Sequence, residues 1–167
     1  MKIMVFLHGT AIMHRGAQGQ PREERVRQVQ VAEASVRDFA GYVPVDHAVE
    51  KLQHWTSLGA EILYLSSHRN SEHVEQDQAV LARYGFPSGP VYFRREGQTY
   101  TSVVEDILPD VLIEDDCESI GGIPQMTYPH LSPAAQAPIK SIVVKEFGGI
   151  DHLPMTSPRC DGVHPYP

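Results

Sequence analysis

Polar side chains follow several apolar runs of this sequence, at the point where each run ends. Imidazole, hydroxyl and guanidinium groups bind anions or transfer protons, and adjacent carboxylates bind cations. If the runs are parallel strands, their carboxyl ends meet at one edge of a sheet, where the ligand site of an open sheet lies. The polar groups are His8-Gly9-Thr10, Ser66-Ser67, Arg94-Arg95 and Glu114-Asp115-Asp116.

The acidic run Glu114, Asp115 and Asp116 is the clearest indication of a metal site. Three carboxylates at the end of a buried strand repel one another, so the arrangement is costly without a cation or hydrogen-bonding partners. Carboxylate oxygens are the ligands that Mg²⁺ prefers. The run therefore predicts a site for Mg²⁺ or another divalent metal, and the alternative is that the three side chains cap helices and loops.

His8 is the candidate for acid–base chemistry, because an imidazole titrates near neutral pH. As a nitrogen ligand it would favour a transition metal over Mg²⁺. The alternative is a polar residue that ends its strand by hydrogen bonding to a neighbouring loop.

A second set of residues is suited to phosphate. Ser66 offers a hydroxyl group beside a predicted helix N-terminus, where backbone N–H groups attract anions, although ordinary N-capping also places serine there. Arginine supplies a fixed positive charge, and glycine allows a sharp turn. The candidate phosphate-binding residues are Gly9, Thr10, Ser66, Ser67, Arg94 and Arg95.

Apolar runs that alternate with helical patterns predict an α/β fold with a parallel sheet. The expected helices begin at Pro21 and Pro44 and cover residues 71–84 and 103–108, where apolar side chains recur at helical spacing. The expected strands cover residues 2–7, 61–65, 91–93, 110–113 and 141–144.

One domain is expected over residues 1–150, with a small cap-like insertion at about residues 15–43 and a C-terminal tail over residues 151–167. The chain from Pro124 onward holds eight of the 13 prolines, which favours irregular structure. Within it, residues 147–154 (FGGIDHLP) either fold over the site as a lid or turn the chain.

The order of the polar groups resembles the haloacid-dehalogenase-like (HAD) superfamily of phosphohydrolases. In that family the first strand ends in Asp-x-Asp-Gly-Thr, the second in Ser or Thr, and the fourth in paired acids. Here residues 6–10 (FLHGT), 65–67 (LSS) and 113–116 (IEDD) stand at those places. The resemblance covers about residues 1–122 and implies a HAD-like Rossmannoid parallel sheet with helices on both faces.

The first motif departs from the family pattern. The resemblance implies a nucleophilic aspartate at position 6 and an acid–base aspartate at position 8, but these positions hold Phe6 and His8. A phenyl ring neither attacks phosphorus nor binds a metal ion, so the aspartyl-phosphate route is closed. The chain is interpreted as a divergent member, and whether it is an enzyme stays open.

Three functions fit these residues. The first is a pseudoenzyme that binds a phosphorylated small molecule or nucleotide and a divalent cation. The second is a metal-dependent phosphoester hydrolase that uses activated water, with His8 as general base. The third is a non-catalytic structural or interaction module. The small insertion implies an open site, or a cap from another subunit of a homo-oligomer.

Composition excludes several classes of protein. The 167 residues carry 14 Lys+Arg against 21 Asp+Glu, a formal charge of −7, so nucleic acid is not an expected partner. Two cysteines are too few for a disulfide scaffold. No apolar run approaches the roughly 20 residues that span a bilayer, and a cytoplasmic protein is expected.

Overall fold

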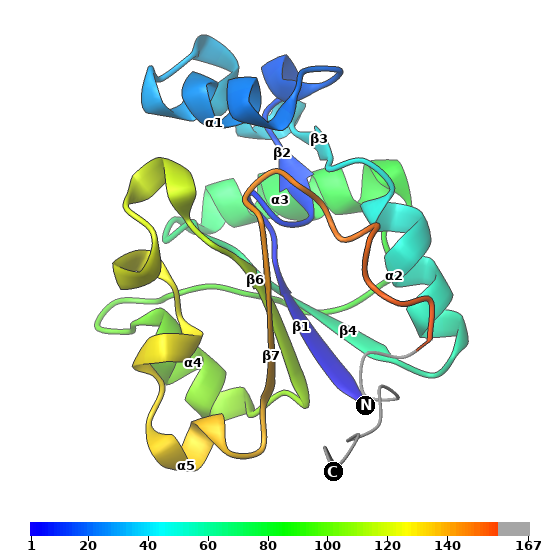
Figure 1. The fold of residues 1–167 in the computed structure, drawn as a ribbon, viewed down its shortest axis with the longest axis vertical. Helices are drawn as coiled ribbons and strands as arrows, with labels where there is room; N and C mark the ends of the chain where they lie inside the picture. The colour runs from blue at the N-terminus through cyan, green and yellow to red at the C-terminus, as the bar shows by residue number, and fades with distance from the viewer. Residues whose placement is uncertain (157–167) are drawn as a thin grey trace, which may run out of the picture.

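The structure is a computed structural model that describes residues 1–156. Its centre is a five-stranded parallel sheet in the order β5-β4-β1-β6-β7, which confirms the predicted fold class. All strands run toward the edge that bears the insertion, as Figure 1 shows. The strands are β1 (Lys2–Phe6), β4 (Glu61–Leu65), β5 (Val91–Tyr92), β6 (Val111–Asp115) and β7 (Lys140–Val144).

Helices cover both faces of the sheet (Figure 1). On one face α2 (Ala48–Ser57) and α3 (Ser71–Tyr84) bury Trp55 and Val80 against alternate residues of the strands, such as Val5. On the other face α4 (Tyr100–Ile107) and α5 (Pro133–Gln136) pack against the intervening strand residues. The strand side chains alternate between the two layers because their period is two.

Helix α3 has clear start and stop signals and one unusual residue. The Asn70 side chain accepts a hydrogen bond from the Glu72 amide at 2.8 Å, and the helix ends at Gly85 with φ of 73°. Its buried face includes Val74 and Asp77. A carboxylate therefore lies on the apolar stripe of this helix.

The insertion after β1 lies over the carboxyl ends of the strands (Figure 1). It contains the antiparallel pair β2 (Ile12–Met13) and β3 (Val43–Pro44), and helix α1 (Arg22–Gln30). Short 3₁₀ turns complete it at Arg15–Ala17, Ala34–Arg37 and Phe39–Gly41. Its own small core contains Val26 of α1 and Phe147 from the chain after β7. The C-terminal segment thus holds the insertion in place.

Several boundaries differ from those expected. Strand β6 continues through Asp115, two residues beyond the predicted end, because β7 pairs with it through Val144. Helix α4 begins at Tyr100 because Thr99 and Ser102 form a capping box before it. The proline-rich stretch after β6 forms short 3₁₀ turns in addition to α5, at Glu118–Ile120, Ile123–Gln125 and Tyr128–His130.

The chain stays against α2 after the sheet ends. The indole of Trp55 donates a hydrogen bond to the Pro154 carbonyl at 3.1 Å, and His47 contacts Asp151 at 2.7 Å. Part of the tail expected from residue 151 is therefore fixed to α2, and residues 157–167 lie outside the described chain.

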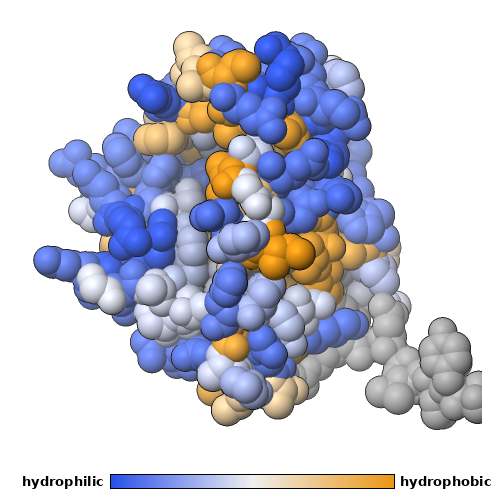
Figure 2. Space-filling model, turned by 60° about the vertical axis from the view of Figure 1, so that its left-hand side comes forward, coloured by the Kyte–Doolittle hydropathy of each residue, from blue (hydrophilic) through white to orange (hydrophobic). Residues whose placement is uncertain are grey.

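The surface shows no long apolar face in the view of Figure 2, where hydrophobic residues form small groups among hydrophilic ones. No helix within residues 1–156 is long and apolar enough to cross a membrane.

Candidate functional site

A cavity of about 230 Å³ lies between the carboxyl ends of the strands and the insertion. Its walls are largely apolar and come from both parts of the chain: Phe6, Val29, Val36, Tyr42, Tyr100 and Phe147. Its polar groups come from strand ends and the loops that follow them, far apart in the sequence: His8, Ser67, Glu114, Asp115, Cys117, Ser119, Gln125 and Glu146. The sheet edge chosen from the sequence is thus where the cavity lies.

His8 is fixed in orientation by residues of two other elements. Its Nε2 lies 3.0 Å from the Asp77 carboxylate, which is fully buried in α3. Its Nδ1 accepts a hydrogen bond from the Ser67 amide at 3.3 Å and lies 2.8 Å from the Ser67 hydroxyl. Since the amide can only donate, Nδ1 is unprotonated and Nε2–H donates to Asp77. His8 is therefore held in one orientation at the wall of the cavity.

The two serines of the second strand end have different surroundings. The fully buried Ser66 hydroxyl donates to Asp77 at 2.6 Å and accepts from the His68 amide at 3.0 Å, so both of its bonds are internal. Ser67 lines the cavity instead. Of this pair, the structure places the Ser67 hydroxyl where a ligand could reach it.

His68 lies behind His8, away from the solvent. The two rings are 4.6 Å apart, and the His68 Nε2 atom is buried without a hydrogen-bond partner. Burial and the neighbouring imidazole of His8 lower the pKa of His68 to about 4. This ring is consequently neutral at physiological pH.

Phe6 ends β1 at the floor of the cavity. Its ring meets Tyr100 edge to face, with centroids 5.2 Å apart. Tyr100 in turn lies under the Arg94 guanidinium, at 3.8 Å. The end of β1 is thus part of a cluster of aromatic rings and a guanidinium.

The acidic run does not form one cluster. Because β6 continues through Asp115, Glu114 and Asp115 point to opposite faces of the sheet. Glu114 accepts hydrogen bonds from the amides of Thr127 and Tyr128 at 2.7 and 2.8 Å. Burial raises the pKa of this carboxyl, and the two amides partly offset the effect. Glu114 is held by the backbone of the following loop.

Asp116 faces away from the cavity. Its carboxylate pairs with Lys145 at 2.9 Å and accepts from the Glu146 amide at 3.0 Å. Partial burial acts to raise the pKa of Asp116, but these contacts hold it below its usual value. The ion pair accounts for this charge without a metal ion.

Asp115 and Glu146 form the acidic wall of the cavity. Asp115 accepts from the Thr10 hydroxyl and the Cys117 amide, both at 2.9 Å, and Glu146 accepts from the Ser119 hydroxyl at 2.7 Å. Burial raises the pKa of both carboxyls, and Asp115 adds to the effect on Glu146. A Cβ atom at residue 9 would lie 2.8 Å from an Asp115 oxygen, so only glycine fits between them.

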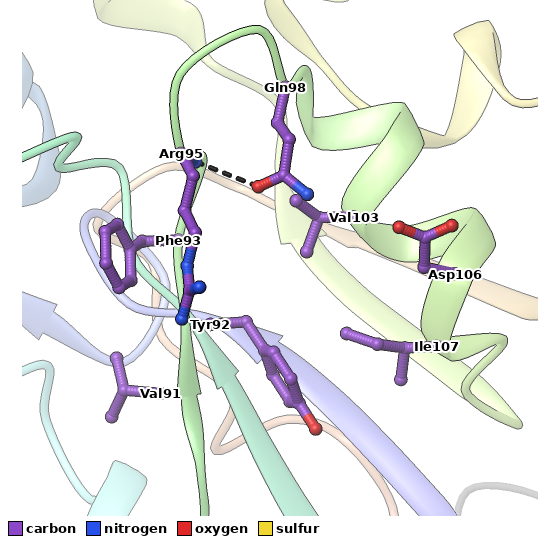
Figure 3. Close-up of a pocket in the computed structure, with 8 residues that line it drawn as sticks. All are labelled: Val91, Tyr92, Phe93, Arg95, Gln98, Val103, Asp106 and Ile107. Carbon is purple, nitrogen blue, oxygen red and sulfur yellow. Dashed lines mark hydrogen bonds between the residues drawn. The ribbon is translucent and has the colours of Figure 1, made fainter.

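The two arginines after β5 point in different directions. The Arg94 side chain donates to the Ser67 carbonyl at 3.0 Å and borders a second cavity, of about 290 Å³. Arg95 instead lies along Phe93 in a shallow pocket at the edge of the sheet, where its backbone amide donates a hydrogen bond to the Gln98 side chain (Figure 3). Of the two predicted cations, Arg94 is the one beside the site.

The second cavity is cationic. Arg69 and Arg94 line it together with Thr101 of α4, and burial together with the Arg69 charge lowers the pKa of Arg94. The Arg94 Nε atom is buried without a partner. Tyr100 and Gln125 line both cavities, so the cationic and acidic cavities are neighbours.

Several site residues were missed by the sequence reading. Glu146 follows the end of β7 by two residues. The last strand therefore has a polar residue after its carboxyl end, as the other strands do, and this pattern could have identified Glu146. Asp77 could have been noticed as a carboxylate on the apolar stripe of its helix. Tyr42 and Phe147 carry no such signal, because only the tertiary fold brings them to the cavity.

Comparison with known proteins gives matches in structure only. No protein-family model matches the sequence, and neither does any curated protein. The class C acid phosphatase from Bacillus anthracis, solved with tungstate bound, has a TM-score of 0.56 at 14% identity, over 89% of this chain and 68% of that one. A chain of the Pnkp1/Rnl/Hen1 RNA repair complex has a TM-score of 0.51 at 12% identity, over 87% of this chain and 43% of that one.

At these identities the likeness concerns the fold alone. The parallel direction of all five strands and the helices on both faces agree with the fold expected from the sequence. The chain therefore shares its fold with the class C acid phosphatase.

Proposed function

We propose that the protein binds a phosphorylated small molecule or nucleotide together with a divalent cation, without aspartyl-phosphate chemistry. The observation that carries the proposal is the pair of neighbouring cavities, one acidic and one cationic, that share Tyr100 and Gln125. A phosphate ester with a bound divalent cation has the complementary charges. The ligand would span the two cavities at the end of the sheet where open α/β folds bind ligands.

The acidic cavity fits a hard cation such as Mg²⁺. Asp115 and Glu146 offer carboxylate oxygens at its wall, and their raised pKa values reflect charges that the surrounding protein neutralises incompletely. These two residues would hold the ion, which would polarise a phosphate oxygen beside it. Of the predicted set, Glu114 also lines this cavity but accepts two backbone hydrogen bonds, and Asp116 pairs with Lys145 outside it.

The cationic cavity fits the phosphate group. Arg94 presents a guanidinium whose Nε has no partner, and Arg69 repels it unless an anion lies between them. Thr101 lies in the first turn of α4, where the helix dipole favours negative charge. The structural neighbour solved with tungstate, an oxyanion, supports an oxyanion site on this fold.

Phe6 argues against covalent catalysis by the family route. The side chain at this position has no oxygen to form an acyl phosphate, and the aromatic contact with Tyr100 occupies the floor of the cavity. Binding without this step suits a sensor or carrier.

The test is isothermal titration of the protein with inorganic phosphate, tungstate and AMP, each with and without Mg²⁺. We expect Arg94→Ala to weaken the tightest of these at least about tenfold, since a charged hydrogen-bonding partner is lost. Arg95→Ala is the matched control, because this neighbouring side chain lies in another pocket, and it should bind as the wild type does. Equal effects of both variants, or no heat with any probe, would contradict the proposal and favour an interaction module.

A second candidate is metal-dependent hydrolysis with His8 as general base. The unprotonated Nδ1 at the cavity wall, oriented by the Asp77 contact at Nε2, favours it. Turnover of an aryl phosphate with Mg²⁺ should then be lost in His8→Ala and retained in His54→Ala. Turnover that survives His8→Ala would rule this mechanism out.

A further inference from the structure

Three potential metal ligands meet behind the cavity, at the junction of β1, β4 and α3. The Asp77 carboxylate lies 3.0 Å from the His8 Nε2 and 3.7 Å from the His68 Nε2. All three residues offer ligand atoms that lie within 4.8 Å of one another. Within residues 1–156, no other three side chains of His, Cys, Asp and Glu come together in this way. The acids of residues 114–116 do not form such a group.

The spacing is close to what a tetrahedral metal ion requires. Metal–nitrogen and metal–oxygen bonds of about 2.0–2.2 Å place neighbouring ligand atoms about 3.4 Å apart. The two distances to Asp77 lie on either side of this value and the remaining pair of ligand atoms lies within 4.8 Å, so side-chain rotations would bring the donors into place. Two imidazoles and one carboxylate suit Zn²⁺ or a similar transition metal better than Mg²⁺, which prefers oxygen ligands.

His68 supplies an independent reason for a ligand at this place. Its Nε2 is buried without a hydrogen-bond partner, and its side chain is only 11% exposed. Buried polar atoms without partners are uncommon in folded proteins, because each one costs the free energy of its lost hydration. A metal ion between this nitrogen and Asp77 would restore the missing interaction.

The surroundings would orient the ligands. The Ser66 hydroxyl donates at 2.6 Å to Oδ2 of Asp77, whereas Oδ1 is the oxygen near the two imidazoles. Once Nε2 binds a metal and Nδ1 carries the proton, the Ser67 hydroxyl, 2.8 Å from Nδ1, can accept its hydrogen bond, and the hydrogen bond that the Ser67 amide donates to Nδ1 is lost. Such outer contacts fix ring and carboxylate orientation in metal sites. The Phe39 ring covers His68, with centroids 4.3 Å apart, and limits access of water.

We propose that His8, His68 and Asp77 bind one transition-metal ion of the Zn²⁺ class, at a site separate from the acidic wall of the cavity. Binding replaces the hydrogen bond between His8 and Asp77: the imidazole proton moves from Nε2 to Nδ1, and the freed Nε2 lone pair binds the ion, with no net release of a proton. His8 then has no free ring nitrogen and no longer acts as a base.

The experiment is a titration of the untagged, chelator-treated full chain with Co²⁺, followed by visible absorption, and with Zn²⁺, followed by metal analysis after gel filtration. With excess Mg²⁺ present to occupy the acidic wall, we expect one Co²⁺ per chain and the intense absorption of a four- or five-coordinate cobalt site. His68→Ala should weaken binding at least about tenfold. It should still fold, since the Nε2 atom that it removes has no hydrogen bond to lose.

Two control variants distinguish this site from nonspecific metal binding and from binding at the acidic wall. His54→Ala removes a histidine of α2 that lies outside the group and should leave Co²⁺ binding unchanged. Asp115→Asn removes the acidic wall used in the proposed function and should also leave it unchanged. No bound ion, wild-type affinity in His68→Ala, or equal losses in His68→Ala and Asp115→Asn would each overturn the metal site, whatever the outcome of the phosphate titrations.

Discussion

At the scale of single residues, His8 is the residue that connects the first strand end with a neighbouring helix and with the next strand end. It occupies the second position of the strand-end motif, yet it is tied to Asp77 on a neighbouring helix and to Ser67 at the next strand end. An aspartate at this position could not make both contacts, because a carboxylate only accepts hydrogen bonds when ionised. The histidine at position 8 and the buried Asp77 therefore depend on each other.

The thiol of Cys117 lies beside the acidic wall, and its pKa reflects this position. Burial raises the pKa of this thiol, and the charges of Asp115 and Glu114 raise it further. Since the thiolate is the reactive form, we expect Cys117 to be alkylated by iodoacetamide more slowly than free cysteine at pH 8. The measurement is intact mass against time in a Cys160→Ser background, which leaves one thiol.

Unfolding the same variant in denaturant supplies the control for this prediction. The thiol should then react at the ordinary rate, because burial and nearby charges are lost. Fast reaction in the folded protein would show that the acids near Cys117 do not carry the charges assigned to them.

Sequence reasoning located the site but could not predict the contacts within it. The carboxyl ends of the predicted strands pointed to His8, Ser67, Glu114 and Asp115, which the structure brings to one cavity. The predicted strand stopped at residue 113, whereas β6 continues through Asp115. Adjacent carboxylates of this longer strand have different hydrogen-bond partners, which the sequence pattern does not specify.

At the scale of elements, the strongest periodic signals gave the correct structure. Helices α2 and α3 and the central strands were predictable because their buried side chains repeat at helical or alternating spacing. The short elements were not. The pair β2 and β3, of two residues each, exists only because the chain folds back over the sheet, and no local pattern specifies such contacts.

The end of α4 contains a strained residue that can be tested. Leu108 has φ of 48°, a left-handed conformation that costs a non-glycine residue about 1 kcal/mol. Its side chain is 49% exposed, so burial of the side chain offsets little of this cost. Leu108→Gly should raise the free energy of unfolding by up to about 1 kcal/mol. Urea denaturation of the two proteins measures the difference.

Leu58 is the matched control for that substitution. It also follows a helix, is 54% exposed and has φ of −87°, which is ordinary backbone for any residue. Leu58→Gly should therefore lower stability by about 0.5–1 kcal/mol, the usual entropic cost of glycine. The same sign of change at both positions would disprove the strain at Leu108.

At the scale of the whole molecule, the acidic charge is divided between two environments. The formal charge of −7 includes surface carboxylates such as Asp116, which pairs with Lys145, and buried carboxylates such as Asp115 and Glu146. The first kind stabilises the fold when ionised, whereas ionisation of the second kind opposes folding. Ionised carboxylates buried at the end of the sheet lower the stability of the folded protein, and such perturbed carboxylates are typical of binding sites.

The pH dependence of stability follows from this division, and the two adjacent aspartates should differ in sign. The raised pKa of Asp115 means that the folded protein binds more protons than the unfolded chain above the ordinary pKa of 3.8, so its contribution to stability is lost as the pH rises. Asp115→Asn should then stabilise the protein at pH 7.5 and have little effect near pH 4. Asp116 has a lowered pKa, so Asp116→Asn should destabilise at pH 7.5, and this effect should fade as the pH falls.

Mg²⁺ connects this pH dependence to the proposed function. An ion held by Asp115 and Glu146 neutralises the charges that oppose folding, and a ligand that binds only the folded state raises the midpoint of thermal unfolding. At pH 7.5, Mg²⁺ should therefore stabilise the wild type and Asp116→Asn but not Asp115→Asn, as measured by differential scanning calorimetry. If Mg²⁺ raised the midpoint of all three proteins equally, the ion would bind elsewhere. The buried charges of Asp115 and Glu146 would then destabilise the fold with no bound cation to neutralise them.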